Sequence, residues 1–530
     1  MANYFNEIEK RRTFAIISHP DAGKTTLTEK FLLYGGAIQE AGTVKGKKNS
    51  KHAVSDWMEI EKQRGISVTS SVLQFNYNGF CINILDTPGH QDFSEDTYRT
   101  LMAADSAVMV IDAAKGIEPQ TRKLFKVCAM RNIPIFTFIN KLDREARNPF
   151  DLLEDLENEF GMDTFPVNWP IGCGKDFKGV YDRQKRQIVA FNDLHSGKEK
   201  IKPIEVEITE TEKLDSVIGP WLRETLVDDI ELLDGASREF DQEAVHHGKL
   251  TPVFFGSALT NFGIEEFLEN FLKMTSPPLS RNSDIGEINP TDDNFSAFVF
   301  KIQANMNKAH RDRIAFMRIC SGKYTKGSEV LHVQSGKKIK LLSTQMMAQE
   351  REIIEEAYAG DIIGVFDPGI FSIGDTVCEN DKNKFKFEGI PTFAPEHFAQ
   401  ISQVDTMKRK QFVKGITQIA QEGAIQIFKE LGYGMEEVIV GVVGTLQFEV
   451  LEYRLKNEYN VDIRINRLPY QHIRWIKNKD LDLKTLSLTS DTKKIVDLKE
   501  NHLLLFINSW GVTWALDHNK DLKLSEFNQQ

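Results

Sequence analysis

Long apolar runs are absent from this 530-residue sequence. No run approaches the ~20 residues needed to cross a bilayer. The opening stretch MANYFNEIEKRRTF has neither an apolar core nor a cleavage site of small residues. The sequence therefore predicts neither a membrane span nor secretion, and we expect a cytoplasmic protein.

Cysteine is scarce, and positive charge is not in excess. The five cysteines form no Cys-x-x-Cys pair and no Cys/His cluster at zinc spacing, so we expect reduced thiols. The net charge of -11 would repel nucleic acid at long range, so an RNA partner would require a local basic face. Internal repeats and low-complexity tracts are also missing.

The remaining composition is that of a globular protein, with 41% hydrophobic and 27% charged residues. The length predicts about three or four domains. In residues 1–278, short apolar runs (TFAIIS, FCINILD, SAVMVID, IPIFTFIN, TPVFFGS) alternate with charged stretches of helical period. This pattern predicts an open, doubly wound α/β sheet. The segment at about 150–250 is too long for one connection and is expected to be an inserted subdomain.

The pattern changes twice after a linker rich in Pro, Ser, Asn and Asp at 278–293. Residues 293–385 contain short β-type runs separated by turns, which predict a small antiparallel β-barrel. Residues 397–530 mix strands with helices and predict an α+β, βαβ-rich domain, in which Phe412, Ile416 and Ile419 share one helical face. The last forty residues show no clear pattern.

The stretch SHPDAGKTTL, residues 18–27, follows an apolar run and has the form of a phosphate-binding loop. Glycine is needed at Gly23, where a Cβ would collide with the anion. Lys24 is placed to reach the β and γ oxygens, and Thr25 offers a hydroxyl to Mg²⁺. Ser18 stands where the general pattern has glycine, but it precedes the close approach to phosphate.

Two further stretches complete a nucleotide site. In LDTPGHQDF, Asp86 ends a buried strand, where its carboxylate can bind Mg²⁺ through water, and Gly89 lets a backbone N–H approach the γ-phosphate. In INKLD, the carboxylate of Asp143 can accept from guanine N1–H and its 2-amino group, which adenine cannot match. Asn140 is expected to tie the base loop to the phosphate loop, and the stem of Lys141 to cover the base.

Two weaker signals accompany them. In GSAL, the backbone N–H of Ala258 can donate to guanine O6, and Ser257 shapes the turn. In EKQRGISVTSS, a hydroxyl can complete the Mg²⁺ shell when GTP is bound, and Ser67 is the candidate.

Together and in this order, SHPDAGKTT, QRGIS, DTPGHQDF, NKLD and GSAL resemble the ribosome-dependent translational GTPases. RIAFMRICSGKYTKGSEV with EEAYAGDIIGV is similar to the barrel that follows the GTPase domain in that family. Members of that family that act in translation termination share this layout: an insertion in the GTPase domain, one barrel and one final α+β domain.

The resemblance implies a GTPase that uses GTP/GDP and Mg²⁺, binds the ribosome (rRNA and ribosomal proteins) and drives off class I peptide chain release factors after peptide release. It implies that His90 orients the attacking water beside an apolar gate of Pro20 and Ile66, and that Asp21 helps to hold charge at the phosphates. No arginine finger is evident in the chain, so activation is expected from outside. A monomer is expected in solution.

The resulting set of site residues contains three expected to act in catalysis (His90, Lys24, Gly89) and three expected at the metal (Thr25, Ser67, Asp86). The residues expected to bind GTP are Ser18, His19, Pro20, Asp21, Ala22, Gly23, Lys24, Thr25, Thr26, Asp86, Thr87, Pro88, Gly89, His90, Asn140, Lys141, Asp143, Ser257, Ala258 and Leu259.

Two departures from the family pattern bear on this set. Ser67 replaces the usual Thr and loses a methyl group, and Ser18 replaces Gly or Ala.

Two questions stay open at this point. The basic run at 45–52 and the basic and aromatic residues of the last domain can meet rRNA or form an ordinary solvated face; the latter residues are Lys408, Arg409, Lys410, Arg454, Lys456, Arg464, Arg467, Tyr470, Arg474 and Trp475. The function can also be that of a translocase-like or ribosome-protection GTPase, or of a GTP-gated ribosome-binding module whose hydrolysis is incidental.

Overall fold

The computed structural model describes residues 4–38, 61, 67–190, 204–236, 239–304, 312–346, 351–379, 382, 384–390, 392–430, 437–478, 483 and 485–526. The basic run at 45–52 and the gate residue Ile66 lie outside these residues. No helix of the described ranges is long and apolar enough to cross a membrane.

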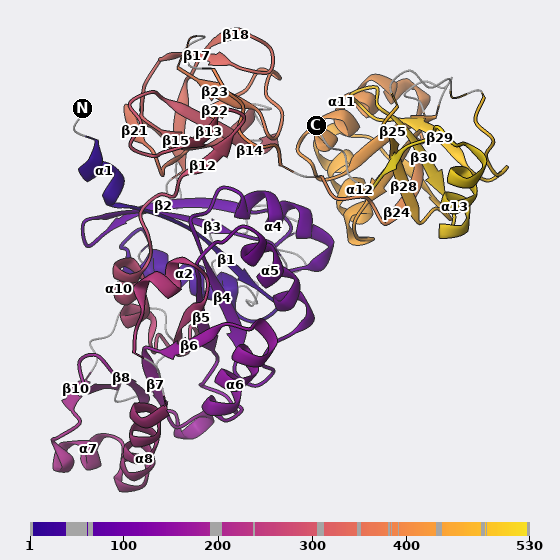
Figure 1. Ribbon diagram of the computed structural model, residues 1–530. Helices are drawn as coiled ribbons and strands as arrows, with labels where there is room; N and C mark the ends of the chain where they lie inside the picture. The colour runs from indigo at the N-terminus through magenta and orange to yellow at the C-terminus, as the bar shows by residue number, and fades with distance from the viewer. Residues whose placement is uncertain are drawn as a thin grey trace.

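A seven-stranded sheet forms the centre of the first part of the chain (Figure 1). Its order is β2-β3-β1-β4-β5-β11-β6, and all neighbours are parallel except β2 and β3. The apolar runs predicted as strands are buried along most of their length, as expected for a sheet covered on both faces. The strands are β1 (Arg11–Ser18), β2 (Ser71–Tyr77), β3 (Phe80–Asp86), β4 (Ser106–Asp112), β5 (Ile135–Asn140), β6 (Asp163–Pro166) and β11 (Leu250–Phe255); the helices are α2 (Lys24–Tyr34), α4 (Ser94–Leu101), α5 (Pro119–Met130), α6 (Pro149–Phe160), α9 (Gln242–His246) and α10 (Ile264–Met274).

The antiparallel edge strand β2 departs from the parallel pattern predicted by the apolar runs. It joins β3 through Asn78 and Gly79, which have φ angles of 46° and 83°. Positive φ at both central residues of a two-residue turn matches the twist of a hairpin, and Asn-Gly is the dipeptide that best adopts it. The hairpin signal was therefore present in the sequence.

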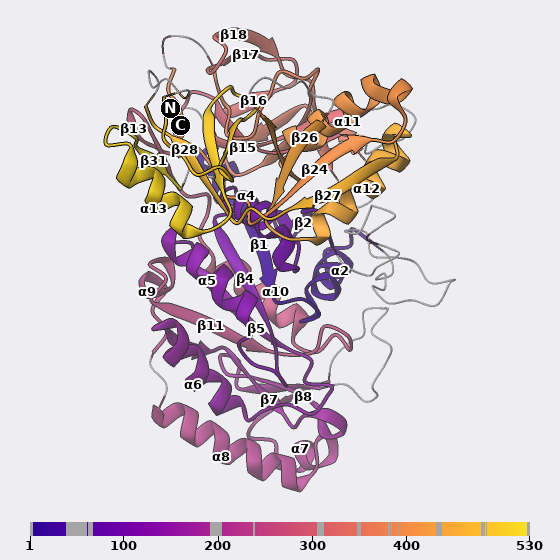
Figure 2. The ribbon, with the colours of Figure 1, turned by 90° about the vertical axis from the view of Figure 1, so that its right-hand side faces the viewer.

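The insertion forms a separate four-stranded antiparallel sheet with two helices, at the end of the molecule opposite the barrel (Figures 1 and 2). It follows β6, which pairs with β11 in the central sheet although it falls within 150–250. The elements are β7 (Asn168–Ile171), β8 (Gly179–Asp182), β9 (Gln187–Ala190), β10 (Ile204–Glu207), α7 (Thr211–Val217) and α8 (Pro220–Ala236).

The second part of the chain is all-β and antiparallel. Eight strands pair in the order β18-β17-β23-β14-β15-β22-β19-β20, and β16 pairs with β21. Ile8 of α1 (Phe5–Glu9) packs into its core, so the N-terminal helix joins the first two parts. The strands are β14 (Ser296–Ala304), β15 (Arg313–Ser321), β16 (Lys323–Thr325), β17 (Glu329–His332), β18 (Lys337–Lys340), β19 (Ser343–Met346), β20 (Arg351–Ile353), β21 (Glu356–Tyr358), β22 (Ile362–Phe366) and β23 (Thr376–Cys378), after the hairpin β12 (Arg281–Ser283) and β13 (Gly286–Ile288).

The third part is an antiparallel sheet in the order β27-β24-β26-β25-β29-β30-β28-β31. β24 lies between β26 and β27, so α12 connects two strands that flank a third, which is a split βαβ unit. Phe412, Ile416 and Ile419 of α11 are all buried in its core, as their helical spacing predicted. The elements are β24 (His397–Gln403), α11 (Arg409–Gln421), β25 (Gln426–Glu430), β26 (Glu437–Val442), α12 (Leu446–Tyr459), β27 (Ile463–Leu468), β28 (His472–Ile476), β29 (Lys493–Val496), β30 (His502–Phe506), α13 (Ser509–His518) and β31 (Leu524–Ser525).

Candidate functional site

Four strands of the central sheet end at one edge with polar residues. β1 ends at Ser18, β3 at Asp86, β4 at Asp112 and β5 at Asn140. Because parallel strands place their carboxyl ends together, these four positions lie at the same edge of the sheet. Most of the predicted site residues follow directly from these strand ends.

The phosphate loop, residues 18–23, leads from β1 into α2. Gly23 has a φ of 102°, and a Cβ there would overlap the side-chain amide of Asn140. Glycine is therefore required by the backbone angle and by the close neighbour. α2 begins at Lys24, so its first backbone N–H groups and the positive end of its dipole face the loop.

Lys24 and Asp86 form an ion pair in this site. The distance from Lys24 Nζ to Asp86 Oδ1 is 2.5 Å, and both side chains are almost fully buried. A buried charge is costly unless it is paired. The pair thus joins the lysine predicted at the phosphates to the carboxylate predicted at the metal.

The DTPGH stretch, residues 86–90, lies against the phosphate loop. Thr87 Oγ1 donates to the backbone carbonyl of Ile16 at 2.7 Å. A Cβ built on Gly89 would lie 3.5 Å from Cα of Pro20, so the two loops run close together. Gly89 thus lies next to the phosphate loop, where a backbone N–H was predicted to approach the γ-phosphate.

His90 caps the short 3-10 helix η1 (Gln91–Phe93). The backbone N–H of Asp92 donates to His90 Nδ1 at 3.2 Å, and Asp92 Oδ1 lies 3.4 Å from the same nitrogen. The His90 side chain is 34% exposed. The histidine is therefore accessible, but one ring nitrogen already has a partner.

Asn140 connects the base loop to the phosphate loop, as predicted from its position. Its Nδ2 donates to the carbonyl of Ala22 at 2.9 Å. Its Oδ1 accepts from the backbone N–H groups of Lys141 and Ala258, each at 2.8 Å. The N–H of Ala258 was predicted to donate to guanine O6, and in this structure it donates to Asn140.

Asp143 and Ser257 meet across the base site. Ser257 Oγ donates to Asp143 Oδ1 at 2.5 Å. The other carboxylate oxygen of Asp143, Oδ2, lies 3.9 Å from Arg144 Nε. The serine thereby orients the carboxylate predicted to recognise guanine. Leu259 ends this stretch with a side chain that is 52% exposed.

Asp112 contacts a predicted site residue but was not itself predicted from the sequence. Its Oδ2 lies 2.7 Å from Lys141 Nζ, which also donates to the carbonyl of Asp21. Burial alone would raise the pKa of Asp112, but hydrogen bonds from Lys141 and from the N–H of Ala114 lower it. A signal existed, because Asp112 ends a buried strand in the same way as Asp86.

The three residues predicted to bind Mg²⁺ come from three separate segments of the chain. Thr25 follows Lys24 at the start of α2, and Asp86 lies opposite. Ser67 stands at the start of a described segment whose next residues are held by Glu61, which accepts from the N–H groups of Val68 and Thr69. Within the described ranges, no group of three or more His, Cys, Asp or Glu side chains could hold a metal. A single carboxylate with hydroxyls nevertheless suits Mg²⁺, which keeps waters and phosphate oxygens as its other ligands.

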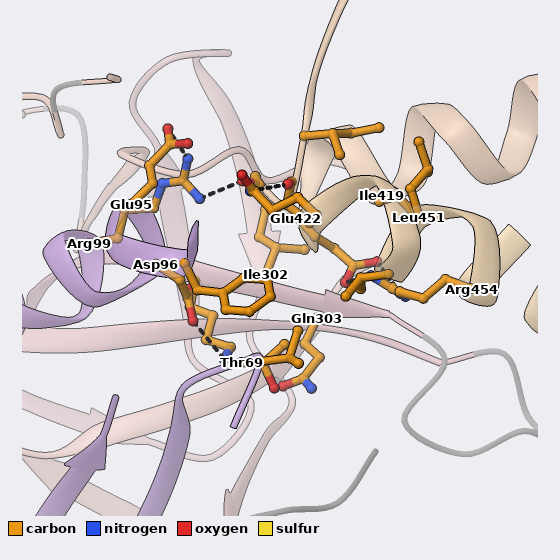
Figure 3. Close-up of a pocket in the computed structure, with 18 residues that line it drawn as sticks. Thr69, Glu95, Asp96, Arg99, Ile302, Gln303, Ile419, Glu422, Leu451 and Arg454 are labelled. Carbon is orange, nitrogen blue, oxygen red and sulfur yellow. Dashed lines mark hydrogen bonds and ion pairs between the residues drawn. The ribbon is translucent and has the colours of Figure 1, made fainter. Parts of the chain in front are cut away.

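A small pocket lies where the three parts of the chain meet. Figure 3 shows Glu95 and Arg99 of α4, Ile302 and Gln303 of β14, and Glu422 and Arg454 of the third part around it. Thus the helix that follows His90 contacts the last domain directly.

Three residues predicted as possible rRNA contacts are buried, which contradicts that interpretation. Arg454 is 3% exposed and pairs with Glu422 and Glu458, while Tyr470 and Trp475 are 8% and 6% exposed. Position 454 lies on the face of α12 that packs toward α11, which the basic character of the stretch did not reveal. Arg464 and Arg467 of the edge strand β27 remain exposed.

Comparison with known families covers nearly the whole chain. Residues 9–277 match the elongation factor Tu GTP binding domain, residues 294–380 match elongation factor G domain 2, and residues 387–516 match the class II release factor RF3, C-terminal domain. A crystal structure of a Thermus thermophilus protein is similar with a TM-score of 0.69 and 21% identity, over 92% of this chain and 72% of that one. That likeness supports the fold.

Curated relatives agree over a comparable length. Peptide chain release factor 3 of Symbiobacterium thermophilum is 55% identical over 523 residues, 98% of each chain. The proteins of that name from Gloeobacter violaceus and Listeria innocua are 52% and 53% identical, again over 98% of both chains. Identity at this level extends through the GTP-binding domain and the C-terminal domain alike, so the chain is a guanine-nucleotide-binding GTPase of translation termination and belongs to the peptide chain release factor 3 family.

Proposed function

We propose that this chain binds the ribosome after peptide release and, with GTP bound, drives off the class I release factor that decoded the stop codon. The observation that supports the proposal is a C-terminal domain of the release-factor type that contacts Asp92, two residues after His90, in a chain with a GTP-binding domain. The full-length identity to release factors favours this role over a translocase-like or ribosome-protection function. We further propose that the protein acts as a cytoplasmic monomer.

In the proposed nucleotide complex, the polyphosphate lies in the loop of residues 18–26. The N–H groups at the start of α2 and Lys24 hold the β and γ oxygens, with Gly89 at the γ-phosphate. His19, Pro20, Asp21 and Ala22 supply the loop backbone. The ion pair of Lys24 with Asp86 opens, because each partner gains an opposite charge from the ligand.

Mg²⁺ would be held by Thr25, Asp86 and Ser67, and would neutralise charge that develops on the phosphate oxygens. The guanine ring would lie over Lys141, with its N1–H and 2-amino group donating to Asp143. Ala258 would turn its N–H from Asn140 to guanine O6, with Ser257 and Leu259 completing that loop.

His90 orients the attacking water in this proposal, and the ribosome fixes the side chain in place. Because the sequence shows no evident arginine finger, we propose that an external group on the ribosome activates hydrolysis. Hydrolysis by the isolated protein is therefore expected to be slow.

The decisive experiment follows a labelled class I release factor as it leaves ribosomes that have already released their peptide. Addition of this protein with GTP should accelerate departure, whereas addition with GDP should not. If departure is not accelerated although ribosomes stimulate GTP hydrolysis, the termination step proposed here is wrong and the chain acts at another step.

A further inference from the structure

Asp92 touches both His90 and the third domain. Its backbone N–H donates to His90 Nδ1 at 3.2 Å. Its Oδ2 accepts from the backbone N–H of Leu446 at 2.7 Å, at the first residue of α12. A carboxylate at a helix N-terminus is stabilised by the unpaired N–H groups and the helix dipole. The other carboxylate oxygen of Asp92, Oδ1, lies 3.4 Å from the same His90 nitrogen, so α12 holds a side chain that faces the proposed catalytic histidine.

Two further contacts hold the same segment. Phe93 packs with Val68 and Val450 in a small apolar cluster that joins the first and third domains. Arg99 donates to the carbonyl of Gly423 at 2.9 Å, next to the pocket in Figure 3. Residues 92–99 are therefore fixed to the third domain at both ends.

These contacts restrict the side chain of His90. Its Nδ1 accepts from Asp92, so this nitrogen is not free to contact a water at the γ-phosphate. A histidine that must contact both a water and an external activating group needs both ring nitrogens. While α12 holds Asp92, the ring is kept in its capping position.

We propose that Asp92 is a positioning residue through which the docked third domain restrains His90, and that separation of α12 from Asp92 frees the histidine for hydrolysis. The proposal rests on the role given above to His90. It makes the third domain a brake on hydrolysis as well as a docking element.

Gly444 offers a way to break the contact from the third domain. A Cβ at this position would overlap the side chain of Asp92 and no other residue is as close, and its φ lies outside the left-handed region. Gly444→Ala should therefore displace the carboxylate without backbone strain. Gly235→Ala is the matched control, because a Cβ on Gly235 of α8 meets nothing within 4 Å.

The measurement is GTP hydrolysis by the full chain without ribosomes, as kcat and KM. Gly444→Ala should raise kcat about tenfold, the order expected when one charge-assisted hydrogen bond is lost, with KM unchanged. Gly235→Ala should match the parent. A kcat that is unchanged or lower in Gly444→Ala overturns the proposal.

Two more variants keep the outcome decisive. Asp92→Ala retains the backbone N–H but removes the carboxylate, and it should also raise kcat. If Gly444→Ala does not fold, an unchanged or lower kcat in Asp92→Ala overturns the proposal. Adding His90→Ala to Gly444→Ala should abolish the gain, and a gain that persists would show that it does not act through His90. Failure of His90→Ala to lower ribosome-stimulated hydrolysis would refute the role of the histidine, whereas an inert Gly444→Ala would refute the restraint alone.

Discussion

At the scale of single residues, Asn140 determines how the halves of the nucleotide site fit together. Its amide satisfies a carbonyl of the phosphate loop and two N–H groups of the base loops. An amide is suited to this position because it both donates and accepts, whereas a carboxylate could only accept. The loop proposed to bind phosphate and the loops proposed to bind the base are thereby linked through one buried side chain.

His90→Ala should leave nucleotide affinity unchanged and lower ribosome-stimulated hydrolysis by about 10²-fold or more, because orientation of the attacking water is lost. Nucleotide affinity is measured with a fluorescent GDP, and hydrolysis with ribosomes in excess. Equal stimulated rates in the variant and the parent would contradict the assigned role.

Asp143→Asn should reduce the preference for GTP over ATP, because an amide cannot accept from both guanine donors. The Ser257 hydroxyl would keep a neighbour, since the amide oxygen can still accept from it. Competition of GTP and ATP for the variant gives the specificity ratio. Arg144→Gln, at an exposed neighbour, should retain the parent's preference; an undiminished preference in Asp143→Asn would show that the base lies elsewhere.

At the scale of elements, the pair of helices α11 and α12 depends on a buried ion cluster. Arg454 bonds to Glu422 at 3.0 Å, just past the end of α11, and to Glu458 at 2.7 Å, one turn along α12. Burial by itself would lower the pKa of Arg454, but the two carboxylates raise it well above its usual value. The guanidinium is therefore charged and links the two helices.

Arg454→Met should destabilise the third domain by about 3–5 kcal/mol, because two buried carboxylates lose their cation. Lys456→Met is the control: this side chain is 67% exposed and its pair with Asp462 should contribute about 0–1 kcal/mol. Native-state hydrogen exchange reports the loss domain by domain. Equal protection of α11 in the two variants would show that the cluster does not join the helices.

At the scale of the whole molecule, the first domain and the barrel form a polar, tightly paired junction. Arg318 of β15 lies 2.5 Å from Asp105 of the first domain, and Arg11 of β1 lies 2.7 Å from Asp361 of the barrel. Thr13 also donates to the carbonyl of Gly360 at 2.7 Å. These buried contacts predict that the first domain and the barrel unfold as one unit.

Arg318→Met should weaken this junction, because Asp105 remains buried without its closest cation at a cost of about 3–5 kcal/mol. Calorimetry should then show separate transitions for the first domain and the barrel, which coincide in the parent. The exposed pair of Arg122 with Glu159 supplies the control variant Arg122→Met. A single unchanged transition in Arg318→Met would contradict the predicted coupling.

The sequence by itself determined much of the fold and the GTPase activity, and it predicted the residues of the nucleotide site. Buried parallel strands appear as unbroken apolar runs, and residues that bind phosphate must follow a strand directly, so Gly23, Lys24, Asp86 and Asn140 could be placed from local pattern. The buried helical face of Phe412, Ile416 and Ile419 was also predicted from a local pattern, the spacing of apolar residues along a helix. Short strands such as β29 and β30 gave no such signal, because strands of four and five residues carry too little periodicity.

Only the tertiary structure decided which side chains meet across domains. The burial of Arg454, Tyr470 and Trp475, the bond of Asp112 to Lys141 and the contact of Asp92 with α12 all join residues that are distant in the sequence or share no local pattern. Charge and aromaticity are properties of a residue, but exposure depends on what packs against it. Local pattern therefore identified the nucleotide chemistry, while the packing of three domains determined which of the remaining polar groups face a partner and which hold the molecule together.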